Sequence, residues 1–220
     1  MTARIREGGG VFVQGQDAVW LVLLPGFQTP AGAYHDLAVT VAGHGPTVFV
    51  PQLVRPGFGS LLGRPDVSTE AVRAAALVAA IRRDQQPGSV VLAGHSRGGL
   101  AAWLVAAHVP LEGLVLIDPV DAAGPRPRHG TFTTRTLQLT FKALIIGAGV
   151  NGPCAPESVN HRAFAAATPG CRHVVIDDLG HADVLSGRLR SPGRRLCKGG
   201  TDPDRALRRV ADLIGAHLPV

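Results

Sequence analysis

The sequence of 220 residues is poor in cysteine and has no long apolar run, and each shortage excludes a class of protein. The three cysteines are too few, and odd in number, for a fold held together by disulfides, although one bridge among Cys154, Cys171 and Cys197 remains open. No run of about 18 apolar residues is free of charge, so we expect no membrane span.

The first ten residues carry Arg4, Arg6 and Glu7 among glycines and contain no apolar core. Neither a signal peptide nor a transit segment is therefore expected, and the pattern predicts a cytoplasmic protein. A mature secreted form that begins after a removed signal would have the same pattern.

Basic charge comes from 20 arginines and two lysines, with a net charge of +6 and a pI near 10.2. Four of the arginines cluster late in the chain, at Arg188, Arg190, Arg194 and Arg195. No aromatic residues are interleaved with them, so the cluster predicts a solvated surface and no nucleic-acid partner. The sequence has no cluster of His, Cys and carboxylate residues at metal-ligand spacing and no Gly-rich phosphate loop, so we expect neither a metal nor a cofactor.

Hydrophobic residues make up 45% of the chain, enough for the core of a single α/β domain over residues 1–220. Short apolar runs alternate with amphipathic stretches, which predicts a mostly parallel, doubly wound sheet. The predicted strands are 11–13, 19–24, 47–50, 90–93, 114–117, 143–146 and 173–176, the first two forming an antiparallel entry hairpin. Helices are predicted after Thr29, at 70–82, at 99–108 and after Asp202.

The stretch Gly94-His95-Ser96-Arg97-Gly98 follows an apolar run and precedes helix-forming sequence. Its Gly-x-Ser-x-Gly pattern is typical of a nucleophile elbow, a tight turn from a buried strand into a helix. A Gly-rich turn that happens to contain serine is the alternative, and the strand before it and the helix after it favour the elbow. Ser96 is thus the predicted nucleophile.

The turn Pro25-Gly26-Phe27 follows the predicted strand 19–24. In α/β-hydrolases a backbone N–H at this point completes an oxyanion hole with the N–H of the residue after the nucleophile. We assign the two donors to Phe27 and Arg97; an ordinary strand-terminating Pro-Gly turn is the alternative.

A serine nucleophile needs a base and an orienting acid, which we expect at the carboxyl ends of later strands. His181 follows the last predicted strand and is the predicted base, because histidine comes last in the chain order of such triads. Asp118 directly ends the strand 114–117, whereas no carboxylate closely follows the strand 143–146. Asp118 is therefore the predicted acid, with Asp121 as the alternative.

The segment 121–140 is too short for a folded cap domain, so the crevice is expected to be open. Its expected walls are mostly apolar and supply no evident charge for a carboxylate or a phosphate. The predicted substrate-binding residues are Phe27, Leu53, Val54, Phe58, Leu61 and Phe132. The expected partner is a neutral, hydrophobic small-molecule ester, and we expect a monomer.

Several short motifs occur in a characteristic order. They are Gly94-His95-Ser96-Arg97-Gly98-Gly99, Ile117-Asp118-Pro119-Val120, Pro153-Cys154-Ala155-Pro156 followed by Val159-Asn160-His161 and Phe164, and Gly180-His181-x-Asp183-x-Leu185. Together they resemble the chlorophyllases, α/β-hydrolases that cleave the phytyl ester of chlorophyll. The resemblance implies a triad of Ser96, Asp118 and His181, in agreement with the strand ends. The chain departs from the family at Pro25, where members often have histidine, and this departure bears on the substrate rather than on the chemistry.

The predicted activity is therefore ester hydrolysis through an acyl-enzyme, on a substrate such as chlorophyll or pheophytin. A general carboxylesterase, a polyester hydrolase, a thioesterase or an acyltransferase would use the same triad. A catalytically idle receptor on the same fold is an alternative of another class, but it need not keep all three triad members with both oxyanion positions.

Overall fold

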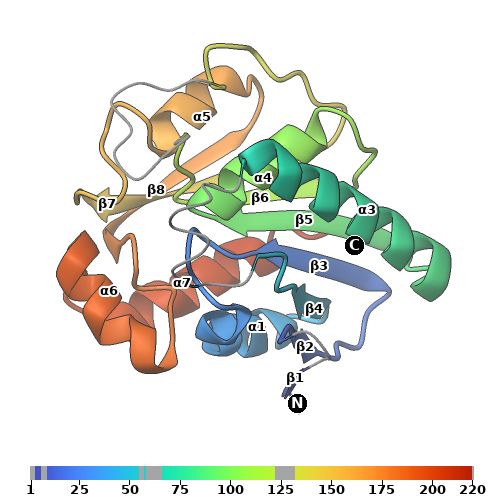
Figure 1. The fold of residues 1–220 in the computed structure, drawn as a ribbon, viewed down its shortest axis with the longest axis horizontal. Coiled ribbons are helices and arrows are strands. Elements are labelled where there is room, and N and C mark those ends of the chain that lie inside the picture. The colour runs from blue at the N-terminus through green and yellow to red at the C-terminus, as the bar shows by residue number, and fades with distance from the viewer. Residues whose placement is uncertain (1–2, 6–8, 55–56, 58–65, 122–131, 220) are drawn as a thin grey trace.

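The computed structural model describes residues 3–5, 9–54, 57, 66–121 and 132–219, and its framework is one eight-stranded sheet (Figure 1). The strand order is β1-β2-β4-β3-β5-β6-β7-β8. The strands are β1 (Ala3–Ile5), β2 (Val11–Val13), β3 (Val19–Leu24), β4 (Thr47–Val50), β5 (Ser89–His95), β6 (Gly113–Ile117), β7 (Ala143–Val150) and β8 (Arg172–Gly180). Neighbours from β4 to β8 pair in parallel, and β2 runs antiparallel to both of its neighbours. The mostly parallel sheet with an antiparallel entry strand is the α/β-hydrolase fold expected from the sequence.

The predicted entry hairpin is wrong. β2 pairs with β4, with Phe12 opposite Phe49, and β3 lies on the far side of β4. The chain between β2 and β3 passes around the start of β4, where the amides of Gln16 and Asp17 donate to the carbonyl of Gly45 at 2.7 and 3.0 Å. β4 therefore inserts between two strands that are adjacent in the sequence.

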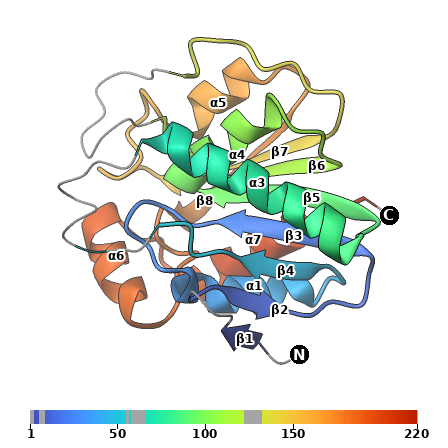
Figure 2. The ribbon, with the colours of Figure 1, turned by 45° about the vertical axis from the view of Figure 1, so that its right-hand side comes forward.

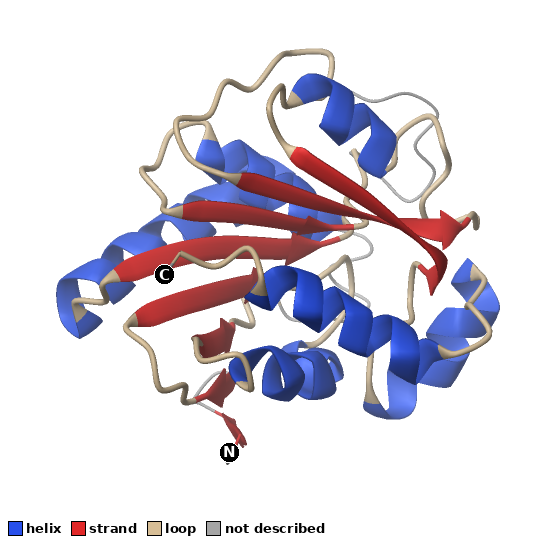
Figure 3. Ribbon diagram, turned by 180° about the vertical axis from the view of Figure 1, so that it is seen from behind, coloured by secondary structure: helices blue, strands red, loops and turns tan. Residues whose placement is uncertain are grey.

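Helices cover both faces of the sheet, with α3, α4 and α5 on one side and α1 and α7 on the other (Figures 2 and 3). They are α1 (His35–Ala42), α3 (Val67–Gln85), α4 (Arg97–Ala106), α5 (His161–Ala167), α6 (Arg190–Cys197) and α7 (Pro203–Gly215), with 3₁₀ turns η1 (Ala31–Tyr34) and η2 (Gly187–Leu189). The helix expected after Thr29 begins as η1. No pattern in the sequence predicts α5 or α6, both of which are short.

Two apolar cores, one on each face of the sheet, bury the central strands, and this is why these strands are continuous apolar runs in the sequence. Every residue of β3 and of β6 is buried, as a parallel sheet covered on both faces requires. Leu37 of α1 and Val210 of α7 belong to one core, whereas Leu100 of α4 and Phe164 of α5 belong to the other. Within the described ranges, no helix has both the length and the apolar character to cross a bilayer.

Candidate active site

Ser96 occupies the turn between β5 and α4 in a backbone conformation that few non-glycine residues adopt, with φ 55° and ψ −124°. At this turn the backbone of α4 lies in close contact with β5 and with the end of β3. A Cβ on Gly98 would lie 2.2 Å from the carbonyl oxygen of Leu24, and one on Gly94 would lie 2.2 Å from that of Gly98. Glycine is therefore required at both positions, and Ser96 is held at the N-terminus of α4, where the peptide dipoles favour negative charge.

The structure brings the three predicted catalytic side chains together. Nε2 of His181 lies 3.0 Å from Oγ of Ser96, and Nδ1 lies 2.6 Å from Oδ2 of Asp118. A carboxylate only accepts hydrogen bonds, so Nδ1 carries the imidazole proton and the lone pair of Nε2 faces the serine hydroxyl. Asp118 is 2% exposed and His181 7%, which keeps water from competing for these bonds.

Asp121, the alternative acid, is engaged elsewhere. Its Oδ2 accepts hydrogen bonds from the amides of Phe132 and Thr133 and from the Thr133 hydroxyl, at 2.9, 2.8 and 2.7 Å. Asp121 therefore holds the chain that leads into β7, and Asp118 is the carboxylate that meets His181.

The loop that carries His181 is held by Asp183, which is fully buried. Its carboxylate accepts from the amides of Gly180 and Gly200 at 2.7 and 2.8 Å and from Nε of Arg194 at 2.7 Å. Part of the late arginine cluster is thus paired rather than simply solvated.

The residues expected to form the oxyanion hole, Phe27 and Arg97, lie on the two segments that flank Ser96. The carbonyl of Gly26 accepts from the amide of Thr29 at 3.1 Å, closing a turn. In a trans peptide the carbonyl and the following N–H point in opposite directions, so the Phe27 N–H points away from this turn. A Cβ on Gly26 would lie 3.3 Å from Cβ of Ser96, which places this backbone directly against the serine. The Arg97 N–H belongs to the first turn of α4, where N–H groups have no acceptor within the helix.

The side chain of Arg97 also links the two segments. Its Nε lies 2.9 Å from Oε1 of Glu70, with both side chains largely buried, and its guanidinium carbon lies 5.5 Å from the centre of the Phe27 ring. Burial raises the pKa of Glu70, and the nearby charge of Arg97 opposes that rise. Glu70 carries no sequence signal, because it lies on α3, 27 positions before its partner.

Three of the predicted substrate-binding residues, Phe27, Leu53 and Val54, line one surface hollow together with Glu70. Its volume is about 460 Å³ including the space open to solvent. Phe132 instead packs against the core beneath α3, α4 and α5. The other two predicted residues, Phe58 and Leu61, lie outside the described residues.

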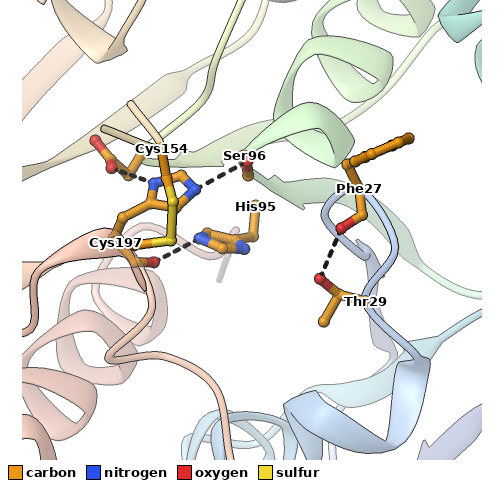
Figure 4. The surroundings of a disulfide bond; sticks show 8 residues. Phe27, Thr29, His95, Ser96, Cys154 and Cys197 are labelled. Carbon is orange, nitrogen blue, oxygen red and sulfur yellow. Dashed lines mark hydrogen bonds and ion pairs between the residues drawn. A yellow bond between two sulfur atoms is a disulfide. The ribbon is translucent and has the colours of Figure 1, made fainter. Parts of the chain in front are cut away.

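Cys154 and Cys197 form the one bridge that the sequence left open, and Cys171 is a free thiol. The disulfide joins the chain after β7 to the end of α6, with the Cα atoms 5.1 Å apart. Figure 4 shows it on one side of Ser96, with Phe27 and Thr29 on the other. Among the residues that the structure describes, no group of three His, Cys, Asp or Glu side chains could hold a metal ion.

Comparison with known proteins gives matches to one family of enzymes. The family model described as Chlorophyllase matches residues 13–218. Chlorophyllase-2 of Arabidopsis thaliana is 29% identical over 233 residues, covering 90% of this chain and 71% of that protein. Chloroplastic chlorophyllase-1 of Citrus unshiu is 24% identical over 226 residues, covering 90% of this chain and 67% of that protein.

Two solved structures have a similar fold. Est1E from Butyrivibrio proteoclasticus has a TM-score of 0.64 at 12% identity, covering 94% of this chain and 93% of that one. An alpha-beta serine hydrolase homologue from Coxiella burnetii has a TM-score of 0.63 at 13% identity, covering 99% and 97%. At these identities the likeness bears on the fold alone.

Proposed function

The chain belongs to the chlorophyllase family of α/β-hydrolases, and from this premise we propose that it is a serine hydrolase with Ser96, Asp118 and His181 as its triad. Carboxylic ester hydrolysis is the activity of this family. The observation that carries the proposal is the position of the His181 imidazole, within hydrogen-bond distance of Ser96 on one side and of Asp118 on the other.

In the proposed mechanism Nε2 of His181 takes the hydroxyl proton as Oγ of Ser96 attacks the ester carbonyl. The N–H groups of Phe27 and Arg97 hold the resulting oxyanion, and the carboxylate of Asp118 stabilises the imidazolium. The C–O bond then breaks, and the alcohol leaves with the proton that His181 returns. Water repeats the sequence on the acyl-enzyme and releases the acid.

The proposed substrate is a neutral, hydrophobic ester, and the phytyl ester of chlorophyll or pheophytin is the candidate that family membership favours. The hollow offers apolar contact from Phe27, Leu53 and Val54, and Gly26, which also lines it, lies against Ser96. Its acidic residue, Glu70, is paired with Arg97, so the hollow presents no net charge to a ligand. Because apolar contact discriminates weakly, at about 1 to 3 kcal/mol per methylene, short p-nitrophenyl esters should also be cleaved.

The test is a panel assay on the purified protein with chlorophyll a and pheophytin a in detergent, p-nitrophenyl butyrate, and a thioester. Release of chlorophyllide and pheophorbide is followed by chromatography, with and without an added alcohol as acyl acceptor. Turnover of p-nitrophenyl butyrate without release of either pigment product would contradict the proposed substrate and leave the chemistry standing. Faster cleavage of the thioester, or transfer to the alcohol, would point to a different acyl acceptor or leaving group.

The nucleophile is tested in the same assay by Ser96→Ala. We expect kcat to fall by something on the order of 10⁴ to 10⁶ with the fold intact, because triad members act as a unit. Ser191→Ala, which changes an exposed serine on α6, is the matched control and should leave kcat unchanged. A folded Ser96→Ala protein that retains activity within about tenfold of the wild type would contradict the triad.

A further inference from the structure

Two buried residues outside the triad, Tyr34 and His95, connect the oxyanion segment to the loop of the catalytic histidine. The amide of Gly26 donates to the hydroxyl oxygen of Tyr34 at 2.8 Å, and this oxygen lies 2.7 Å from Nδ1 of His95. Nε2 of His95 lies 2.8 Å from the carbonyl oxygen of His181. Tyr34 is 0% and His95 3% exposed, so solvent does not compete for these bonds.

The direction of each hydrogen bond follows from what its partners can do. The carbonyl of His181 can only accept, so Nε2 of His95 carries the proton and Nδ1 carries the lone pair of a neutral imidazole. The Tyr34 hydroxyl therefore donates to Nδ1 while its oxygen accepts from the Gly26 amide. Burial raises the pKa of Tyr34 and lowers that of His95 to about 3, so both side chains hold these protonation states at neutral pH.

We propose that His95 and Tyr34 are positioning residues for ester hydrolysis, which set the oxyanion segment and the His181 loop at the correct distance from Ser96. The proposal rests on the proposed function. Tyr34 and His181 lie 61 and 86 positions from His95 in the sequence, whereas His95 is the immediate neighbour of the nucleophile. One side chain thus connects the elbow to both of the other segments that must meet the ester.

The groups at the two ends of this chain of bonds give it a functional consequence. One end is the amide of Gly26, in the peptide unit that precedes the Phe27 donor. The other end is the backbone carbonyl of His181 itself. The ring centroids of His95 and His181 also lie 4.7 Å apart. A shift of about 1 Å in either group would misplace a donor or the base, an error that can cost about 100-fold in rate.

The kinetic test uses variants that each remove part of this chain of three hydrogen bonds. Tyr34→Phe keeps the ring and removes the hydroxyl with its bonds to Gly26 and His95, whereas His95→Leu removes both bonds of the imidazole. For each we expect kcat on p-nitrophenyl butyrate to fall by about 10- to 100-fold while KM stays within about threefold, because the hydrogen bonds place reacting groups and do not bind the substrate. His95→Gln keeps a donor within reach of the His181 carbonyl and should recover about tenfold of the kcat that His95→Leu loses.

The double variant Tyr34→Phe/His95→Leu tests whether the two residues act in one chain. Because both single variants already break the bond between Tyr34 and His95, the double variant should lose clearly less kcat than the product of the two single losses. Losses that multiply would mean independent roles and would overturn the proposal.

Thr168→Val is the matched control for a purely structural role. It removes a buried hydrogen bond in which Nε1 of Trp103 donates to the Thr168 hydroxyl at 2.9 Å, outside the catalytic segments. We expect it to lower Tm and leave kcat unchanged. If Tyr34→Phe likewise lowers Tm but keeps kcat within about twofold of the wild type, the residues serve stability alone and the proposal fails.

A readout without turnover separates this proposal from the proposed function, whose failure would appear as a wild-type protein that cleaves no ester. In ¹⁵N NMR of the wild type, the His95 side chain should be a neutral imidazole protonated at Nε2, with no titration between about pH 5 and 8. Tyr34→Phe should shift the backbone amide signals of both Gly26 and His181. An Nδ1-protonated or titrating His95, or an unchanged His181 signal, would overturn the proposal whether or not the protein turns over an ester.

Discussion

The amide of Ala148 donates a hydrogen bond to Oδ1 of Asp118 at 3.1 Å, which leaves Oδ2 to face Nδ1 of His181 at 2.6 Å. β7 supplies this amide because it continues to Val150, beyond its last parallel pair with β6 at Ile146. Asp118 itself has a positive φ of 39°. The neighbouring strand therefore decides which carboxylate oxygen meets the histidine.

Asp118→Asn should lower kcat by roughly 10⁴ while preserving the fold. The asparagine oxygen can keep the bond from Ala148, but its amide then points a donor at Nδ1 of His181. The imidazole must move its proton to Nε2, where it can no longer accept the proton of Ser96. Asp121→Asn is the control, since that carboxylate holds Phe132 and Thr133, and it should cost far less activity. A reversed order of the two effects, measured with p-nitrophenyl butyrate, would show that the acid is misassigned.

Glu70→Gln should destabilise the fold through Arg97, because it leaves a buried guanidinium without its counter-charge. We expect the free energy of unfolding, measured by urea denaturation, to fall by about 3 kcal/mol. The double variant Glu70→Gln/Arg97→Met should regain most of that loss, since no buried charge then remains unpaired. Asp84→Asn, which breaks the exposed pair with Arg83, should leave stability unchanged. A Glu70→Gln protein as stable as the wild type would contradict a role for this ion pair.

Stability should decline as the pH falls below about 6.5, the pKa of histidine in an unfolded chain. Burial lowers the folded-state pKa of His161, His173 and His217, and that of His95 to about 3. Between the folded and unfolded pKa values only the unfolded chain binds the proton, so acid favours unfolding. His95 alone contributes a slope of about 1.4 kcal/mol per pH unit. Glu70, whose pKa is raised, acts with the opposite sign and only while its carboxyl group titrates.

Urea midpoints measured at pH 7.5, 6.5 and 5.5 test this dependence. We expect the midpoint to fall at each step and to fall less steeply in His95→Gln, which has no imidazole at position 95. A wild-type midpoint that stays level or rises toward pH 5.5 would contradict the buried neutral histidines.

The disulfide should contribute substantially to stability. Cys154 and Cys197 are 43 positions apart, and closing a loop of that length lowers the unfolded-state entropy by the equivalent of about 4 kcal/mol. Cys154→Ser/Cys197→Ser should therefore unfold at a lower urea concentration, and a reductant should bring the wild type down to a similar midpoint. Cys171→Ser, at the free thiol, is the control and should change the midpoint little. Equal midpoints for the wild type and the double variant would contradict this contribution.

Much of the fold could be predicted because local signals mark the element ends. Asp202, after which a helix is predicted, caps α7 by accepting from the amide of Arg205, and Leu207 and Val210 of this helix pack in the core. α5 and α6 could not be predicted, because helices of seven and eight residues show too few turns for a periodic apolar face.

The sequence by itself determined the fold class and the strand ends at which Ser96, Asp118 and His181 stand. Parallel strands bring their carboxyl ends to one edge, so residues that follow separate strands can be expected to meet there. Only the tertiary structure decided that β2 pairs with β4, that Cys154 bonds Cys197 and that Glu70 meets Arg97. Each of these pairings joins segments distant in the chain, and local polarity and spacing carry no information about which distant partner a residue will contact.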